Sequence, residues 1–455
     1  MQATQFPVLS NISQPTGTSQ SDTLEPPVEI WRYFLLPALL HVPLVLVLRS
    51  FSSLGAVYVL LLLIIGLYQL RKEKPDALIL VCGYISSAEL IWRMTNAPVF
   101  WETGKYLLAL LLGLGILRWK KKLAMKPLLY LTVLVPSAII SLSAMSWGTV
   151  REHLSFNLSG PILLSVAALF FSGLQISRQS FNRLMLLGTV PIIGVWALAV
   201  RTMLLSDSIQ FLNYSNFTTS GGYGPNQVSA LLGLGVLFCW IYIFNARPTG
   251  FRWALMFGIS LGLMAQAILT FSRGGVFNLA FAIPAATYFF TRHQKRTQRF
   301  VLGTMAVLII ALAFLIPNLN QFTGGSLATR YEDFNMTNRE AIMESDLELW
   351  RRNLVFGVGV GVSTLMRNEM LSISATSHTE YTRLLAEHGL FGLVALFLLI
   401  SMSWQVFHQA KGNLAKGSVL GFVLWVLAEM VHSAMRIAAI SFVFAIPFAH
   451  LDLEE

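Results

Sequence analysis

The clearest chemical pattern in the sequence surrounds one histidine, His378. Ser377 can cap a helix that begins near His378, and the loop before it is basic. A helix N-terminus and nearby arginines both favour the neutral form of an imidazole. A neutral imidazole can accept a proton, so His378 is a candidate general base. The alternative is a capping or solvent-facing histidine with no chemical role.

Arginines form the second chemical pattern, because they gather on one predicted side of a membrane. If the N-terminus is cytoplasmic, Lys/Arg-rich loops alternate along the chain as the positive-inside rule requires. The other side then holds one lysine, Lys105, and many arginines. Guanidinium groups bind phosphate or carboxylate through paired hydrogen bonds, so we expect an anionic ligand there. Any single arginine could instead anchor a helix or pair with an acid. The twelve outer arginines are Arg49, Arg93, Arg151, Arg201, Arg273, Arg330, Arg339, Arg351, Arg352, Arg367, Arg383 and Arg436.

The composition indicates the elements that must position these groups. Of 455 residues, 55% are hydrophobic and 12% are charged, with a net charge of +10. Mean hydropathy is +0.64. These values exclude a soluble enzyme, and the scattered positive charge argues against a nucleic-acid partner. Cys82 and Cys239 both lie in apolar runs, so neither a redox framework nor a metal site is expected from them. The sequence therefore predicts an all-α polytopic membrane protein.

The apolar runs predict twelve to fourteen transmembrane helices, because about 20 apolar residues cross a bilayer. Membrane lipids are therefore expected partners. The candidate segments are 31–48, 53–70, 76–93, 104–118, 128–146, 160–176, 184–205, 226–245, 252–271, 275–291, 300–317, 389–408, 416–433 and 436–450.

Four regions follow from these spans. We expect a flexible cytoplasmic tail at 1–30, a transmembrane bundle at 31–317, a large outer loop at 318–387 and C-terminal transmembrane helices at 388–455. A loop of that length is usually functional or contains structure of its own.

An amphipathic helix is predicted inside the large loop, between Asn338 and Trp350. Its apolar side would carry Ile342, Met343, Leu347, Trp350 and Leu354, while the acidic pair Asp346 and Glu348 would face solvent. The glycines of 357–361 lack the lysine and spacing of a nucleotide loop, so they predict a sharp turn with closely packed backbone.

Two more outer features could bind a ligand. Thr270 to Gly275 joins two spans almost without a loop and holds Arg273 at the interface, and Arg201 lies near the outer end of another span. The stretch from Asn213 to Gln227 is polar, aromatic and rich in glycine, and it includes Tyr223 and Asn226. Such a loop suits a hydroxyl-rich ligand such as a sugar, or it is a plain extracellular turn.

Two sets of ionisable residues lie within predicted spans. Glu89 and Arg93 are one helical turn apart, and Glu429, His432 and Arg436 would share one helix face. Ionisable residues at membrane depth are functional candidates by default. Structural ion pairs are the alternative for both sets.

Three motifs in order resemble the bacterial O-antigen ligase and polymerase superfamily. That family often has an asparagine where Thr379 stands here, which weakens any role for position 379. The motifs are Ser272-Arg273-Gly274-Gly275, then Asn353 to Gly361 with its alternate glycines, then Ser377-His378-Thr379-Glu380-Tyr381 running into Glu387-His388-Gly389-Leu390-Phe391-Gly392.

The resemblance implies a GT-C-like membrane glycosyltransferase of the bacterial inner membrane, with its site facing the periplasm. The donor would be an undecaprenyl-diphosphate-linked oligosaccharide, and the acceptor a hydroxyl on a glycan, lipid A-core or protein. It implies that His378 is the key histidine and that Arg201 and Arg273 bind the diphosphate. Secondary candidates are Arg352 and Arg383 for the diphosphate (or for pairing with glutamate) and Glu380, Tyr381, Tyr223 and Asn226 as supporting or acceptor-binding residues.

The chemistry of this transfer fits the residues. Undecaprenyl diphosphate is already a good leaving group, so a base and fixed positive charge suffice. We therefore expect direct displacement with inversion, without a metal or cofactor. A transporter or flippase of lipid-linked or anionic substrates is the main alternative, although no internal repeat is visible. A membrane component without an active site is a further alternative, and the choice between ligase and polymerase stays open.

Overall fold

In the computed structural model the described residues are 30–119, 123–292, 295–332, 339–371 and 375–453. They form an all-α polytopic membrane protein, as predicted. Among them, eleven helices are long and apolar enough to cross a membrane, and Leu54–Gln69 and Ala438–Phe448 are shorter apolar helices. The predicted tail at 1–30 lies outside the described residues except for Ile30.

The first half of the chain is built of helices joined by short connections. Their bounds are η1 (Trp31–Leu35), α1 (Leu36–Ser50), α2 (Leu54–Gln69), α3 (Asp76–Met94), α4 (Thr103–Trp119), α5 (Met125–Val133), α6 (Val135–Ala144), α7 (Trp147–Phe171), β1 (Gln175–Ser177), α8 (Arg178–Leu204), η2 (Thr218–Ser220) and α9 (Pro225–Ala246).

The second half continues the bundle and contains the large loop. Its elements are α10 (Phe251–Leu269), α11 (Arg273–Thr291), α12 (Lys295–Phe322), α13 (Ser326–Glu332), α14 (Arg339–Arg352), α15 (Val362–Leu371), α16 (Glu380–Gln409), α17 (Asn413–His432), α18 (Ala438–Ala445), η3 (Ile446–Phe448) and β2 (His450–Asp452).

One predicted span has different bounds in the structure. The segment predicted at 160–176 belongs to a longer helix, α7, which begins at Trp147 and ends at Phe171. A short parallel pair of strands follows it, in which Ile176 lies opposite Leu451. This pair was not predicted, because each strand has only three residues and periodicity cannot be read over so short a run.

Glycine allows the closest helix packing near the motif at Arg273. Helix α11 packs extensively against α17 and also against α9. A Cβ atom on Gly275 would lie 2.2 Å from the carbonyl oxygen of Ser229, so only glycine fits between α11 and α9. This packing fixes the start of α11, where Arg273 lies.

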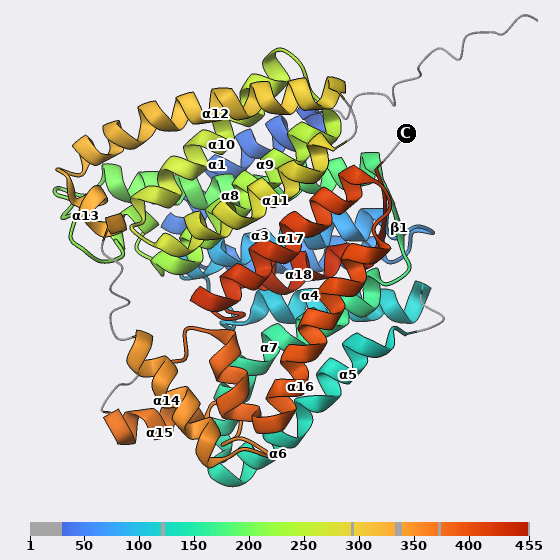
Figure 1. Cartoon of the computed structure of the whole chain (residues 1–455), viewed down its shortest axis with the longest axis vertical. Helices are drawn as coiled ribbons and strands as arrows, with labels where there is room; N and C mark the ends of the chain where they lie inside the picture. The colour runs from blue at the N-terminus through green and yellow to red at the C-terminus, as the bar shows by residue number, and fades with distance from the viewer. Residues whose placement is uncertain (1–29, 120–122, 293–294, 333–338, 372–374, 454–455) are drawn as a thin grey trace, which may run out of the picture.

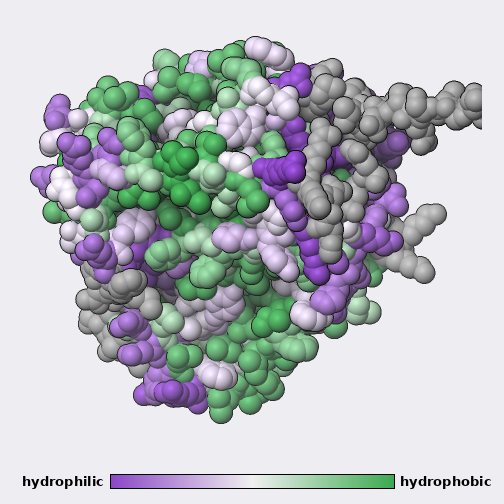
Figure 2. Space-filling view, turned by 45° about the horizontal axis from the view of Figure 1, so that its top comes forward, coloured by the Kyte–Doolittle hydropathy of each residue, from purple (hydrophilic) through white to green (hydrophobic). Residues whose placement is uncertain are grey.

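Hydrophobic side chains cover much of the outside of the bundle. Only 11% of the most apolar stretch of α12 is buried inside the protein. Its side chains Ile310 and Phe314 are 69% and 75% exposed. Figure 2 shows hydrophobic surface on this face between hydrophilic groups at its margins. Such a surface is what a bilayer covers.

The helices of the large loop gather at one end of the bundle. In Figure 1, α13, α14 and α15 lie on one side of the molecule and β1 lies on the other. Helix α14 packs against α16 and α15. The first residues of α11 and α16 and the last residues of α17 therefore meet the large loop on the side that the charge pattern predicts to be outer.

Candidate functional site

His378 lies in the short segment that precedes α16. The helix begins at Glu380, and its cap is Thr379, whose hydroxyl oxygen accepts a hydrogen bond from the Tyr381 backbone N–H at 3.2 Å. The prediction that Ser377 caps this helix was therefore wrong, because the helix begins two residues later than expected. The Ser377 hydroxyl instead donates to Asp346 at 3.1 Å.

The imidazole of His378 is held in its neutral form by its surroundings. Burial and, in decreasing order of influence, the charges of Arg339, Arg436 and Arg367 together lower its pKa from the usual 6.5 to about 4. The sequence predicted a neutral imidazole and the effect of arginines. Burial, the largest cause of the lowered pKa, was not predicted.

Arginines from different elements, either buried or half-buried, meet around this histidine. Burial lowers the pKa of Arg339, and the charge of Arg273 lowers it further, although Glu429 acts in the opposite direction. Burial also lowers the pKa of Arg436 to about 10, with Arg383 adding to the effect. Neighbouring guanidinium groups produce a positive potential that attracts anions.

The end of α17 brings a second histidine to this group. The helix ends at His432, so Arg436 lies beyond it and does not share a helix face with Glu429, contrary to the prediction. A Cβ atom on Gly274 would lie 3.3 Å from the His432 Cβ, which places His432 beside the start of α11. Glu429 accepts a hydrogen bond from Asn278 of α11 at 2.5 Å.

The polar loop from 213 to 227 packs onto the motif that contains Arg273. The Ser272 hydroxyl donates to Asn226 at 2.8 Å, and the Asn216 backbone N–H donates to the Thr270 carbonyl at 2.8 Å. Tyr223 lies further along the loop, where its hydroxyl donates to Gln227 at 3.0 Å. The structure thus places the polar loop of 213–227 next to the segment from Thr270 to Gly275, which is separate from it in the sequence.

Glu89 and Arg93 belong to a buried charge network, so the ion-pair alternative describes their contacts. Arg93 donates to Glu89 at 2.7 Å, and Lys105 lies 2.6 Å from Glu102, which also lies 3.5 Å from Arg93. Arg93 also donates to the carbonyl oxygen of Arg436 at 3.0 Å. The network therefore holds the backbone from which the Arg436 side chain reaches the site.

Arg383 is also in ion pairs, which was the alternative to a role in diphosphate binding. Its guanidinium group donates to Glu380 at 2.5 Å and to Glu387 at 2.8 Å, and all three side chains are buried. The Tyr381 hydroxyl donates to the Leu427 carbonyl at 2.8 Å. Glu380 and Tyr381 therefore hold the first turn of α16, which begins two residues after His378.

Two of the predicted arginines lie apart from His378. Arg352 is exposed on α14 and donates to Glu348 at 2.8 Å. Arg201 is partly buried in the last turn of α8. Neither side chain has a contact with His378 among the described residues.

Asp346 corrects the predicted face of the amphipathic helix. It was expected to face solvent, but its side chain is fully buried in an ion pair with Arg367. The buried side of α14 is Ile342, Ser345, Asp346 and Leu349, whereas Leu354 is 56% exposed. The apolar pattern was misleading here, because a charged residue on the packed face is stable when it is paired.

The glycine run forms the close turn that was predicted. Gly357, Gly359 and Gly361 all have positive φ. The Val358 and Gly359 backbone N–H groups donate to the carbonyl oxygens of Ala386 and Glu387 at 2.9 and 3.1 Å. The turn therefore hydrogen-bonds to the backbone of α16 just before Gly389. The positive φ of Gly389, 59°, interrupts the helical conformation there.

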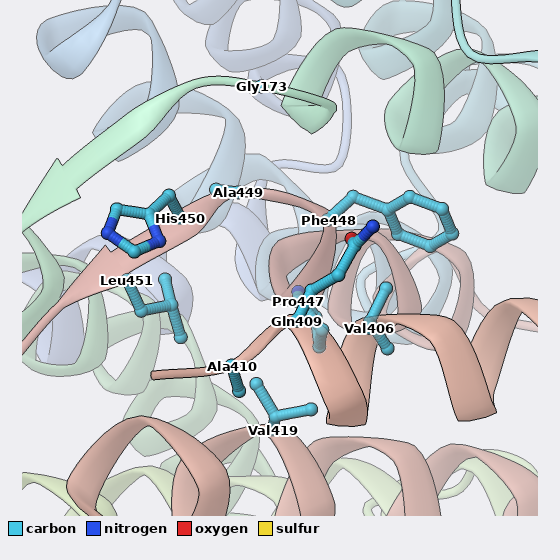
Figure 3. Close-up of a pocket in the computed structure, with 10 residues that line it drawn as sticks. All are labelled: Gly173, Val406, Gln409, Ala410, Val419, Pro447, Phe448, Ala449, His450 and Leu451. Carbon is cyan, nitrogen blue, oxygen red and sulfur yellow. The ribbon is translucent and has the colours of Figure 1, made fainter. Parts of the chain in front are cut away.

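The cavities on the surface lie elsewhere. One of about 220 Å³ is lined by Gly173, Gln409 and His450, at the end of α16 remote from His378 (Figure 3). Two others, of about 330 and 220 Å³, lie along α7 and share Leu154 and Leu158. Within the described ranges no cluster of three or more His, Cys, Asp or Glu side chains could hold a metal ion. Metal independence stays a prediction.

Four site residues were missed as members of the site: Arg339, Arg436, Arg367 and Asp346. The first three were among the outer arginines, so their side of the membrane was a usable signal. Their convergence depends on the packing of α14, α15 and the segment after α17, which no local pattern contains.

Comparison with known proteins adds one match. Residues 265–397 match a family model described as O-antigen ligase. This match supports the resemblance to the O-antigen ligase and polymerase superfamily. The matched segment of this superfamily includes Arg273, Arg339, Arg367 and His378, and it supports an O-antigen ligase or polymerase type of glycosyl transfer. Arg201 and Arg436 lie outside it. No curated protein matches the sequence.

Proposed function

We propose that this chain is a membrane glycosyltransferase of the bacterial inner membrane. It would move a glycan from undecaprenyl diphosphate to an acceptor hydroxyl on the periplasmic face, in the polymerisation or ligation of a surface polysaccharide. The observation that carries the proposal is the half-buried, neutral His378 among the charges of Arg339, Arg436 and Arg367.

The imidazole of His378 takes the proton of the acceptor hydroxyl. The hydroxyl oxygen attacks the anomeric carbon of the donor sugar, and the bond between that carbon and the diphosphate oxygen breaks. The leaving diphosphate keeps the electron pair. One direct displacement inverts the anomeric configuration, and the protonated histidine later releases its proton to water.

The arginines stabilise the negative charge that grows on the departing diphosphate. The charge of Arg273 disfavours that of Arg339, so an anion bound beside Arg339 would offset this repulsion and be attracted to both guanidinium groups. Arg436 adds a third charge near His378. Arg201 stays a proposed diphosphate ligand through the family resemblance.

The ion pairs of Arg352 and Arg383 argue for other roles. Arg383 is occupied by Glu380 and Glu387, and it stabilises the helix start rather than a ligand. The loop that contains Tyr223 and Asn226 lies beside the Arg273 motif, where a sugar could contact it.

Transfer can be tested with purified protein, a lipid-linked oligosaccharide and an acceptor glycan. A new glycosidic product together with free undecaprenyl diphosphate would support the proposal. Movement of the lipid-linked substrate across proteoliposomes without a covalent product would contradict it and favour a transporter. In a deletion strain, short single-repeat chains would indicate a polymerase, and unligated polymer on its carrier would indicate a ligase.

A further inference from the structure

The imidazole ring of His378 has no hydrogen bond of its own in the part of the chain that the structure describes. Its position must therefore come from the backbone on either side. A general base must lie within hydrogen-bond reach of its proton, and a displacement of about 1 Å can cost about a hundredfold in rate. The bonds that hold the neighbouring residues are therefore important for catalysis.

Ser377, the residue before His378, is held at both its side chain and its backbone. Its hydroxyl donates to Asp346 Oδ1 at 3.1 Å and accepts from Arg367 Nη2 at 2.9 Å. Arg436 Nη2 donates to its carbonyl oxygen at 3.2 Å. Arg367 Nη1 also donates to the Ala375 carbonyl. Two residues near His378 are thus tied to a single guanidinium group.

Asp346 and Arg367 form a fully buried ion pair that connects three helices. Asp346 lies on α14 and Arg367 on α15. The other carboxylate oxygen of Asp346 accepts from the Thr382 hydroxyl of α16 at 2.9 Å, and Arg367 Nε donates to Ser345 at 2.8 Å. The pair therefore sets the position of the His378 segment relative to all three helices.

A buried ion pair is a costly way to fill this space. Desolvation of two charges offsets most of their attraction, and well-packed apolar residues are often as stable. The directional hydrogen bonds of such a pair do more than apolar packing can, because they fix one geometry. Most of the polar atoms of this pair bind Ala375, Ser377 or the first turn of α16, so the geometry they fix is that of His378.

We propose that Asp346 and Arg367 are positioning residues that act through Ser377 to hold His378 at the acceptor hydroxyl. This inference rests on the proposed function, since it assigns a role in the same reaction. Neither residue touches the reacting atoms.

Two matched variants test the role, because each removes one hydrogen bond to Asp346. Ser377→Ala removes the bond on the histidine side, and Thr382→Val removes the bond on the α16 side. We expect Ser377→Ala to lower kcat by at least about tenfold with a donor KM within about twofold of wild type. Thr382→Val leaves both hydrogen bonds of the Ser377 hydroxyl in place, so its fall in kcat should be smaller than that of Ser377→Ala, within about threefold. Equal effects of the two variants, or a Ser377→Ala effect on KM alone, would overturn the positioning role.

Asp346→Asn gives a second measurement that a purely structural role would not change. Without the carboxylate, the positive charge of Arg367 acts fully on His378 and favours the neutral imidazole. The acid limb of the pH dependence of kcat/KM should therefore move to lower pH, together with a fall in kcat. An unchanged limb would contradict the inference. This measurement also serves if Ser377→Ala does not fold.

The same assays separate this inference from the proposed function. If wild-type protein transfers glycan and His378→Ala does not, while Ser377→Ala behaves as wild type, the positioning role fails and the function stands. If wild-type protein forms no glycosidic product, the function itself fails.

Discussion

Arg436 donates a hydrogen bond at 3.2 Å to the carbonyl oxygen of Ser377, and so joins the segment after α17 to the residue before His378. The carbonyl oxygen of Arg436 in turn accepts from Arg93 at 3.0 Å. Through Arg436, two hydrogen bonds thus connect the charge network of α3 with the residue that precedes the proposed general base.

Replacement of His378 should remove the base. We expect His378→Ala to lower kcat by about 10²–10⁴-fold, which is the usual contribution of general base catalysis. Turnover of a lipid-linked donor measures the effect. His408→Ala is the matched control, because His408 is exposed near the other end of α16. Near-normal turnover by His378→Ala would remove the assignment.

The pH dependence should differ between free and donor-bound protein. In the free protein His378 has a pKa of about 4, so it is neutral above that pH and becomes protonated as pH falls. A bound diphosphate offsets the arginines and raises the pKa of His378. The acid limb of kcat/KM, which reports the free protein, should therefore lie at lower pH than that of kcat. Coincident limbs would argue against an anion beside His378.

Inorganic pyrophosphate should stabilise the protein by relieving repulsion between Arg273 and Arg339. Binding to the folded state alone raises the free energy of unfolding by about 2.7 kcal/mol at a hundredfold excess over Kd. A rise in melting temperature with pyrophosphate, absent in Arg339→Ala, is the expected result. Arg352→Ala is the control, since Arg352 lies exposed beside Glu348. An equal loss of the shift in both variants would contradict the proposed anion site.

Chelation should leave transfer unchanged. The proposed mechanism uses arginines to stabilise the departing diphosphate, so no divalent cation is needed for that charge. Turnover measured with EDTA should match turnover without it. Loss of activity that a divalent cation restores would show that metal independence is wrong.

Gly357 should be essential for the stability of the large loop. A Cβ atom there would lie 2.4 Å from the Glu387 carbonyl carbon, and the residue has a φ of 69°. We expect Gly357→Ala to lower the free energy of unfolding by at least about 1–3 kcal/mol, because a positive φ and a backbone clash combine. Gly303→Ala is the control, since nothing lies within 4 Å of a Cβ at that helical position. Equal melting temperatures would contradict this account.

Most of the spans could be predicted from sequence, because a bilayer requires long apolar helices and soluble proteins seldom contain apolar runs of that length. The glycine turn at 357–361 was also predictable, since alternate glycines without a nucleotide-binding pattern leave few other structures. The strands β1 and β2 were not, because three residues give no periodicity and their partners lie far apart in the chain.

The site was predictable in its residue types and less so in its geometry. His378 and Arg273 stand in short motifs, so they could be selected by sequence. Asp346 was expected to face solvent because it is charged, and the partner that makes its burial stable, Arg367, lies on another helix. Arg339 likewise joins the site through the folding of the large loop.

The last helix and strand of the described chain have a consequence for biosynthesis. Ala438 donates its backbone N–H to Glu89 at 2.6 Å, α18 packs against α7 and α3, and β2 pairs with β1. These late residues fit between helices that leave the ribosome much earlier. Until these residues are synthesised, Glu89 lacks its hydrogen bond from Ala438 and Arg93 lacks its bond to the Arg436 carbonyl. A protein halted before residue 436 would hold nearly all of its spans and yet lack an ordered site.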